Sequence, residues 1–443
     1  MMKRILLALA AAGLLGGCGG LGIGGKGKKN VTPTVGERIS VLSRERVLEV
    51  DPALSGVAVT LPPAQANGEW TQSGGNAAKS MGHLALGSAP AMAWRVSTGE
   101  GSSNQGQLAS SPVIGEGRIF TIDTRAVVRA ISPENGATIW QSQVRGENAP
   151  EGALFGGGVA YDNGRIYATN GAGDAAALDA KTGALVWRVR PGGPLRGAPT
   201  VANDNVYVVS QDNQLFALNP ASGATRWTGS GAVEIAGILG ASSPAAAQGT
   251  VVAGFSSGEL NAYRYENGQN LWQDALARTS ISTSVTQLSD IDADPVIDAG
   301  RVFAVGQGGR MVAIELITGQ RVWEINVAGI STPWVAGDWI FVVTDEAQLL
   351  ALSRTNGHIR WMTQLTRYRD VKDKKGRIDW VGPILAGDRL VLANSAGQIV
   401  YVSPSEGRVL ATQDTKMPVS LQPIVANNTL YVLHDNGQLT AWR

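Results

Sequence analysis

Few residues of this 443-residue chain have the types and spacing that catalysis requires. The three histidines, His83, His358 and His434, lie in unrelated segments, and none has the spacing of a metal ligand. Acid–base and nucleophilic chemistry need several such groups in one constellation. The Gly-rich stretch 156–158 reads as a flexible turn rather than a phosphate loop. The residue types therefore predict no catalytic centre, no metal site and no bound cofactor.

The single cysteine, Cys18, is the residue whose surroundings point most clearly to a chemical modification. Lys3 and Arg4 open the chain, an apolar run extends to Leu15, and glycines stand directly before Cys18. A charged start, an apolar run and small residues are the three regions of a secretory signal, and this run is too short to span a membrane comfortably. We therefore expect residues 1–17 to be a signal peptide.

Leu15, two glycines and Cys18 together resemble the lipobox of bacterial lipoproteins. The resemblance implies that cleavage makes Cys18 the new N-terminus and that lipid is attached to it, with several acyl chains for stable anchoring. Gly19, rather than Asp, follows the cysteine, which by resemblance to enterobacterial lipoproteins implies an outer-membrane protein facing the periplasm. An ordinary cleaved signal with an incidental cysteine is the alternative.

The overall composition restricts both the fold and the partners. Basic residues number 37 and acidic residues 36, so the formal charge of +1 provides no electrostatic footprint for nucleic acid. The 57 glycines fit many short strands joined by tight turns. We expect an all-β chain, with a lipidated N-terminus and flexible spacer from 18 to 66 ahead of a body from 67 to 443.

One unit recurs through the body: a Pro-led apolar strand, two further strands separated by turns, and a last strand that carries Trp. A complete copy runs from Ser111 to Trp140, and later copies end at Trp187, Trp227, Trp272, Trp323, Trp361 and, without the Trp, Leu410. Six repeats cover the 270 residues from Trp140 to Leu410, a mean of 45. This period is that of four-stranded propeller blades, and the recurring Trp is expected in the core.

The two ends of the body predict how the ring closes. The last unit stops at Arg443 after its third strand, whereas Ala91 to Val96 looks like an isolated fourth strand carrying Trp94. Placing this N-terminal strand on the C-terminal blade closes the ring and removes its open edges. We expect an eight-bladed β-propeller of four-stranded antiparallel blades. Seven blades is the alternative, if one irregular unit is not a blade.

The repeat core Ala-Leu-Asp-x-x-Thr-Gly-x-x-x-Trp, present from Ala177 to Trp187, resembles the pyrroloquinoline-quinone type of repeat. Quinoprotein dehydrogenases share this repeat and carry a vicinal disulfide and a calcium site. A chain whose one cysteine is Cys18 cannot form that disulfide. The resemblance therefore argues for the fold of these enzymes and against their quinone chemistry.

The signal, the lipobox and nearly the whole body resemble the BamB family, propeller lipoproteins of the bacterial outer-membrane β-barrel assembly machine, the BAM complex. Segment 194–199 resembles the Leu-Arg-Gly loop with which that family engages BamA, and segment 288–292 resembles its Leu-Ser-Asp-x-Asp motif. Loops on a rigid scaffold are where binding residues are expected. The resemblance implies BamA contacts by Leu195, Arg196, Asp290 and Asp292.

Each of these four residues also has a purely structural interpretation. In the binding hypothesis Leu195 is an exposed apolar anchor, Arg196 donates to partner carboxylates or carbonyls, and the two aspartates are acceptors. In the alternative Leu195 packs into the propeller, and Asp290 and Asp292 cap turns through their own backbone. The family's additional Leu two positions before Leu195 is replaced here by Gly193, which changes the apolar part of the contact.

Segment 367–377 stands apart, because it holds six basic and two acidic residues, net +4, in a connection between blades. Such runs are usually solvated loops, although this one could touch a partner or anionic headgroups.

The sequence thus predicts a non-catalytic outer-membrane lipoprotein that binds BamA within the BAM complex and assists insertion of β-barrel proteins, with unfolded outer-membrane proteins as further candidate partners. The rival hypotheses are a quinone-dependent dehydrogenase and a periplasmic cell-wall or carbohydrate binder.

Overall fold

The computed structural model describes residues 48–147, 154–232, 241–276 and 290–443. The predicted signal peptide, Cys18 and the spacer up to residue 47 lie outside the described residues, as do Leu288 and Ser289. The described part belongs to one compact unit from Leu48 to Arg443. None of its helices is long and apolar enough to cross a membrane.

The strands are short because β-forming runs alternate with turn residues. In one hairpin a buried strand ends at Asp162, and Asn163 and Gly164 take positive φ values of 44° and 73° before the next strand begins. Positive φ at both central residues is the backbone of a tight hairpin turn, which Asn-Gly favours. In this blade the inner three strands are largely buried, whereas the outermost strand (Leu185–Val189) is exposed at three of its five residues and buries its Trp.

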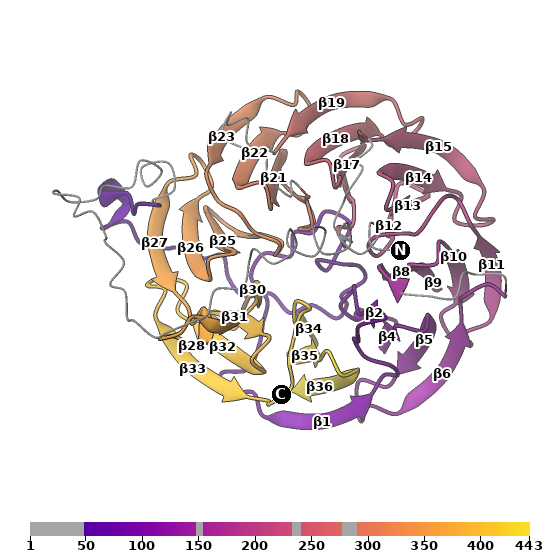
Figure 1. Cartoon of the computed structure of the whole chain (residues 1–443), viewed down its shortest axis with the longest axis horizontal. Helices are drawn as coiled ribbons and strands as arrows, with labels where there is room; N and C mark the ends of the chain where they lie inside the picture. The colour runs from indigo at the N-terminus through magenta and orange to yellow at the C-terminus, as the bar shows by residue number, and fades with distance from the viewer. Residues whose placement is uncertain (1–47, 148–153, 233–240, 277–289) are drawn as a thin grey trace, which may run out of the picture. The chain divides into compact units, whose positions relative to one another are not determined.

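In the described residues the strands form eight four-stranded antiparallel sheets, the blades, arranged as a ring (Figure 1). Blades 1 to 4 consist of β3 (Val113–Gly115), β4 (Arg118–Ile122), β5 (Val127–Ile131) and β6 (Thr138–Gln143); β8 (Gly157–Asp162), β9 (Arg165–Asn170), β10 (Ala175–Asp179) and β11 (Leu185–Val189); β12 (Thr200–Ala202), β13 (Asn205–Val209), β14 (Gln214–Leu218) and β15 (Thr225–Ser230); and β16 (Ala245–Ala247), β17 (Thr250–Gly254), β18 (Glu259–Arg264) and β19 (Asn270–Ala275).

Blades 5 to 8 continue the same order. They consist of β20 (Val296–Asp298), β21 (Arg301–Gly306), β22 (Arg310–Glu315) and β23 (Arg321–Ile325); β24 (Trp334–Ala336), β25 (Trp339–Val343), β26 (Gln348–Ser353) and β27 (Ile359–Gln364); β30 (Trp380–Ala386), β31 (Arg389–Asn394), β32 (Gln398–Val402) and β33 (Val409–Asp414); and β34 (Ile424–Ala426), β35 (Thr429–Leu433), β36 (Gln438–Trp442) and β1 (Met92–Ser97). Outside the blades lie a 3-10 helix η1 (Pro52–Leu54), the parallel pair β2 (Gly106–Gln107) and β7 (Leu154–Phe155), and the hairpin β28 (Tyr368–Asp370) and β29 (Lys375–Arg377).

The ring closes as the sequence predicts, with the N-terminal strand β1 as the outer strand of the C-terminal blade. Trp94 of β1 lies opposite Ala441 of β36 in an antiparallel ladder. Ala91 and Arg443 extend this ladder through two backbone hydrogen bonds of 2.6 and 2.9 Å. Figure 1 shows the purple β1 beside the yellow β36. The prediction of eight blades is confirmed, and the seven-blade alternative is wrong.

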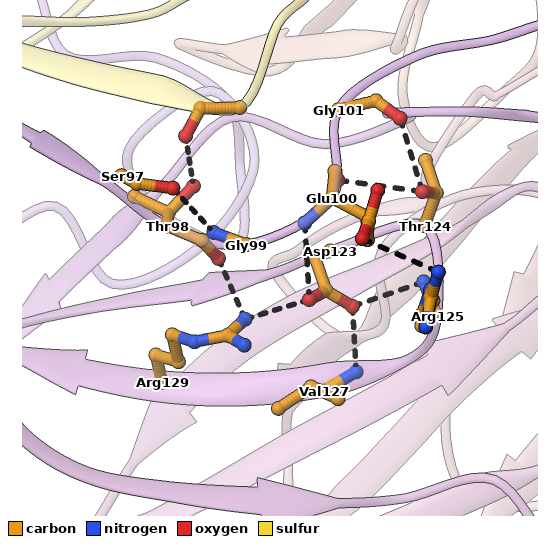
Figure 2. A network of polar contacts seen from close by, with 11 residues as sticks. Ser97, Thr98, Gly99, Glu100, Gly101, Asp123, Thr124, Arg125, Val127 and Arg129 are labelled. Atoms are coloured by element: carbon orange, nitrogen blue, oxygen red, sulfur yellow. Dashed lines mark hydrogen bonds and ion pairs between the residues drawn. The ribbon is translucent and has the colours of Figure 1, made fainter.

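A polar network connects the seam, where β1 pairs with β36, to blade 1 (Figure 2). The buried Asp123 carboxylate accepts hydrogen bonds from the backbone N–H groups of Arg125 and Val127, each 2.9 Å long. Arg129 donates from Nη1 to Asp123 Oδ2 and to the carbonyl of Thr98, both at 2.7 Å. Because Thr98 directly follows β1, the network joins the last blade to the first.

The Trp of one blade explains a Gly in the next. Each of seven tryptophans donates from Nε1, over 2.8–3.1 Å, to a backbone carbonyl in the turn that follows the third strand of the neighbouring blade: Trp94, Trp140, Trp187, Trp227, Trp272, Trp323 and Trp361. The Gly of that turn has positive φ, and a Cβ on it would lie 2.5–2.9 Å from the Trp. The Gly therefore serves both the turn and the contact between blades.

Ring closure explains why the seventh copy of the sequence repeat, in blade 7, lacks its Trp. The strand register places Ala411, opposite Tyr401, where the other blades have Trp, so the sequence alignment to Leu410 is wrong by one residue. Blade 8 takes its fourth strand, β1, from the N-terminal side, so no turn joins that strand to the third strand β36. A Trp in blade 7 would have no turn carbonyl or turn glycine to contact.

The apolar core lies between neighbouring blades all around the ring. Separate clusters of buried side chains fill the spaces between blades 1 and 2, 2 and 3, 3 and 4, 4 and 5, and 5 and 6, and a larger cluster connects blades 6, 7, 8 and 1. Burial of both faces of each sheet explains why the strands lack a clean apolar–polar alternation.

Residues 67–84, which we call the axial strap, cross one end of the ring and bond to every blade (Figure 1). Along the strap, the partner residues lie on blade 8 and then on blades 1 to 7 in order: Asn427, Ile114, Tyr161, Val201, Ala246, Ile297, Trp334 and Leu385. Most of these bonds run between backbone groups, and Gln72 and Trp334 contribute side chains. The sequence did not predict this element, since a strap without periodic hydrophobicity resembles a loop.

Candidate functional site

The segment 194–199, which connects blades 2 and 3, is held by backbone bonds on both sides. The N–H of Arg196 donates to the carbonyl of Val209 at 2.8 Å, and its own carbonyl accepts from the N–H of Gly157 at 2.6 Å. Leu195 forms an isolated bridge with Ser210. This connection is therefore a fixed part of blades 2 and 3.

Leu195 is not the exposed apolar anchor that the binding hypothesis expects. Its side chain is fully buried in the cluster between blades 2 and 3, which includes Val208 and Phe216. The bridge to Ser210 turns the side chain into this cluster. The exposure expected for Leu195 is wrong, and any contact that it supports must act through the position of its neighbours.

Arg196, Asp290 and Asp292 meet in the structure, although they are almost a hundred residues apart. Arg196 Nη2 donates to Asp290 Oδ1 at 2.7 Å and to the carbonyl of Ile291 at 3.3 Å, and lies 3.5 Å from Asp292 Oδ1. Gln307 donates to the other oxygen of Asp292. The Arg196 and Asp290 side chains are essentially inaccessible, and that of Asp292 is 14% exposed. We call these three residues the Arg–Asp brace.

The brace connects two blades that are not neighbours. Arg196 precedes blade 3, and the two aspartates precede blade 5. The connection into blade 4 passes between them and comes close to Gly197. A Cβ on this residue would lie 2.3 Å from the carbonyl oxygen of Ala241, so the glycine leaves the room that the connection needs. The sequence analysis placed these residues together at one surface and expected their charged groups to contact a partner. In the structure their charged groups contact one another.

Burial dominates the electrostatics of the brace. It raises the pKa of Asp290, against the opposing charge of Arg196. Burial, and next the Asp290 charge, raise the pKa of Asp292 to about 6, again against Arg196. One guanidinium thus faces two carboxylates, each with a raised pKa.

Two further buried charged residues, Lys79 and Asp294, link the blade connections to the axial strap. Asp294 accepts hydrogen bonds from Ser73 Oγ at 2.6 Å and from the Ser243 N–H at 2.7 Å, and burial raises its pKa. Lys79 donates to Thr200 Oγ1 at 3.1 Å, and burial lowers its pKa to about 8. The charge of each opposes the shift of the other. Sequence reasoning missed Lys79 and Asp294, because neither belongs to a motif or a repeat.

An axial cavity of about 390 Å³ lies between the strap and the blade connections. Trp70, Ser73 and Gly74 of the strap contribute to its lining, as do Asp292 and Asp294. In the described residues no group of three or more His, Cys, Asp or Glu side chains is placed to hold a metal ion.

Eight blades, seven of them marked by Trp and the last closed by an N-terminal strand, define a propeller of the pyrroloquinoline-quinone repeat class. A family model described as outer membrane protein assembly factor BamB matches residues 123–363, more than half of the chain. The chain belongs to the BamB family, as its sequence motifs imply.

Curated relatives cover most of the body. The outer membrane protein assembly factor BamB of Vibrio cholerae is 29% identical over 354 residues, which cover 79% of this chain and 88% of that protein. BamB of Escherichia coli is 27% identical over 352 residues, which cover 79% of this chain and 87% of that protein.

Solved structures share the fold at lower identity. The crystal structure of BamB from Moraxella catarrhalis aligns with a TM-score of 0.66 at 20% identity, covering 80% of this chain and all of that one. Quinohemoprotein alcohol dehydrogenase from Comamonas testosteroni also aligns at 0.66, with 13% identity, covering 86% of this chain and 81% of that one. The blade arrangement is therefore common to assembly factors and enzymes, and it does not by itself distinguish them.

Proposed function

We propose that this protein is a non-catalytic scaffold lipoprotein of the outer-membrane β-barrel assembly machinery, anchored through Cys18 and bound to BamA. Membership of the BamB family is the observation that carries this proposal. The lipid on Cys18 holds the chain at the periplasmic face of the outer membrane.

The proposed BamA-binding face lies over the blade 3 connection (194–199) and the blade 5 connection (290–295), where Pro194 is exposed and Asp292 is partly exposed. The Arg–Asp brace supports this assignment, because it holds two connections from separate blades at a constant spacing. A partner that contacts both connections meets a preorganised surface and loses little conformational entropy on binding. In this proposal Arg196, Asp290 and Asp292 act as positioning residues, and Leu195 holds its connection against blade 3.

Gly193 offers a gain-of-function test of the same assignment. It is partly exposed beside Leu195, at the position where the family has an additional Leu. A Cβ on Gly193 would meet only Asp212 Oδ1, at 3.8 Å, so a larger side chain fits there. Gly193→Leu adds apolar surface to the proposed face without disturbing the brace.

The test is recovery of BamA with purified wild type, Gly193→Leu and the double variant Asp290→Arg, Asp292→Arg. Charge reversal places three cations together and should abolish recovery, whereas Gly193→Leu should increase it severalfold. The matched control is Asp123→Arg, which destroys a similar buried ion pair at the seam between blades 8 and 1. It should be destabilised to a similar degree and still recover BamA.

Undiminished recovery with the Asp290, Asp292 variant would remove the assigned face. Equal loss in the Asp123 control would show that general destabilisation causes the effect, which also contradicts the assignment. The quinoprotein hypothesis rests on the shared blade architecture alone, and bound quinone or calcium in the purified protein would revive it. Retention on cell-wall sacculi is the corresponding test of the carbohydrate-binding hypothesis.

A further inference from the structure

The basic segment 367–377 forms a projecting hairpin, which we call the basic hairpin. Its strands β28 and β29 pair antiparallel, with Tyr368 opposite Arg377 and Asp370 opposite Lys375. Residues 371–374 form the turn, and every residue from Arg369 to Arg377 is exposed. The hairpin lies in the connection between β27 of blade 6 and β30 of blade 7.

The base of the basic hairpin is attached to both blades. Arg367 pairs with Glu346 of blade 6 and lies over the Tyr368 ring, 5.4 Å from its centroid. Arg377 pairs with Asp379 at 3.0 Å, and Arg369 donates to the carbonyl of Ser395 of blade 7 at 2.7 Å. The hairpin therefore has a fixed direction relative to blades 6 and 7.

The tip, in contrast, has cations without partners and an exposed apolar side chain. No described residue forms an ion pair or a side-chain hydrogen bond with Lys372 or Lys374, and Lys375 contacts Asp373 at 3.6 Å within the tip itself. Val371 is 70% exposed, the largest value among the exposed large hydrophobic residues of the described chain. The six basic and two acidic residues of the segment give it a net charge of +4, although the whole chain carries only +1.

This combination matches the chemistry of an anionic bilayer surface. Lysine ammonium groups interact with lipid phosphates while their aliphatic stems and a neighbouring apolar side chain enter the boundary of the acyl region. A specific protein interface, by comparison, typically uses about 20–30 residues on each side. Eleven residues with one exposed apolar side chain form too small a surface for a stable protein interface on their own.

The position of the hairpin in the ring fits the same partner. Val50 bridges to Ile359 at the start of β27, and Arg360 donates to the carbonyl of Val57 at 2.8 Å. The basic hairpin begins just beyond the other end of β27, roughly 20 Å away at the rise of an extended strand. The chain arriving from the N-terminal side and the hairpin therefore both flank the outer strand of blade 6.

We propose that the basic hairpin docks on anionic phospholipid headgroups through Lys372, Lys374 and Lys375, with Val371 at the acyl boundary. Docking turns the edge formed by blades 6 and 7 toward the bilayer. This inference rests on the proposed anchor at Cys18 only for the position of the hairpin, and it does not use the binding of BamA.

The test measures vesicle binding by full chains that carry Cys18→Ser, so that no acyl group contributes. Vesicles of phosphatidylglycerol with phosphatidylethanolamine are compared with vesicles of phosphatidylcholine by flotation. Wild type should bind the anionic vesicles and not the neutral ones. Lys372→Glu with Lys374→Glu should weaken binding by about 20-fold or more, since each cation near an anionic surface contributes about fivefold. Val371→Asp should weaken it by several fold.

The matched control is Lys181→Glu with Arg264→Glu, two exposed cations on blades 2 and 4 whose reversal changes the net charge equally. This control should bind like wild type. Equal binding of wild type to both vesicle types, or an equal loss in the control, would overturn the inference. If the hairpin variants lost BamA recovery while vesicle binding stayed unchanged, the hairpin would be a protein contact and the membrane inference would be wrong.

Discussion

At the residue scale, Arg196 is the side chain on which most of the candidate face depends. Its guanidinium is buried, and it compensates two carboxylates from another blade. Breaking a buried ion pair by removing one partner leaves a charge that neither water nor protein compensates. The cost of such a change is much larger than the net stabilisation of the intact cluster.

We expect Arg196→Ala to lower the free energy of unfolding by about 3–5 kcal/mol. The triple variant Arg196→Met, Asp290→Asn, Asp292→Asn removes every charge of the brace and should recover most of this loss. Urea unfolding at pH 7 provides the measurement. A loss below about 1 kcal/mol in the single variant would mean that the brace does not hold the connections.

Asp292 should make the stability of the fold depend on pH between about 4 and 6. Its pKa is near 3.9 in an unfolded chain and raised to about 6 in the fold. The folded state therefore retains a proton that the unfolded state has lost, and stability falls as pH rises through this window. Asp292→Asn should flatten the curve and add about 1–3 kcal/mol near pH 7.

Chemical unfolding of wild type and Asp292→Asn at half-unit pH steps measures this difference. Other buried carboxyl groups, among them Asp294, also have a raised pKa, so only the difference between the two curves reports on Asp292. Asp338→Asn, at an exposed turn, is the control and should follow wild type. Parallel curves for Asp292→Asn and wild type would refute the assignment.

At the element scale, the unit of the fold is a pair of neighbouring blades joined by a Trp and a Gly. The recurring Thr-Gly-x-x-x-Trp pattern makes contacts in both directions along the ring. Its Gly packs against the Trp of the preceding blade, and its Trp packs against the turn Gly of the following blade. The pattern ends where the ring closes, since blade 8 takes its fourth strand from the N-terminal side.

Gly319→Ala tests the contact between blades 4 and 5. A Cβ there would lie 2.5 Å from Trp272 at a φ of +71°, so both overpacking and backbone strain oppose it. We expect a loss of about 2–4 kcal/mol in urea unfolding. Gly300→Ala is the matched control, because φ is +77° and no heavy atom lies within 4 Å of its Cβ. It should lose only about 1 kcal/mol, and equal losses would show that Trp272 is irrelevant.

At the scale of the whole molecule, two devices hold the ring together: the β1–β36 closure and the axial strap. The strap bonds to all eight blades, and its Trp70 stacks on Trp334 of blade 6 with ring centroids 6.2 Å apart. Trp70 itself pairs through its backbone with Ile114 of blade 1. One residue thus connects blades 1 and 6, which are not neighbours in the ring.

Trp70→Ala should destabilise the protein by about 3–5 kcal/mol, because Trp70 is only 1% exposed and the cavity left behind cannot collapse against a fixed ring. Ile317→Ala, at a side chain that is 66% exposed, should change stability by less than about 0.5 kcal/mol. Guanidinium unfolding of the two variants gives the comparison. A loss in Trp70→Ala as small as that of the control would show that the strap does not stabilise the ring.

The sequence by itself determined the repeating parts of this protein. Trp spacing, turn glycines and the unpaired Trp94 strand define eight blades and their closure, because each depends on local turn geometry or on contacts between neighbouring repeats. The sequence also selected Arg196, Asp290 and Asp292 as a group, through their resemblance to the motifs of a family.

Only the tertiary structure decided what these residues do inside the chain. The burial of Leu195, the pairing of Arg196 with Asp290 and the path of the axial strap all depend on contacts between segments distant in sequence. Such contacts leave no periodic pattern, because a single buried ion pair or an irregular strap occurs once and repeats nowhere. Whether a charge faces a partner or another residue of the same chain is settled by where the ring places it.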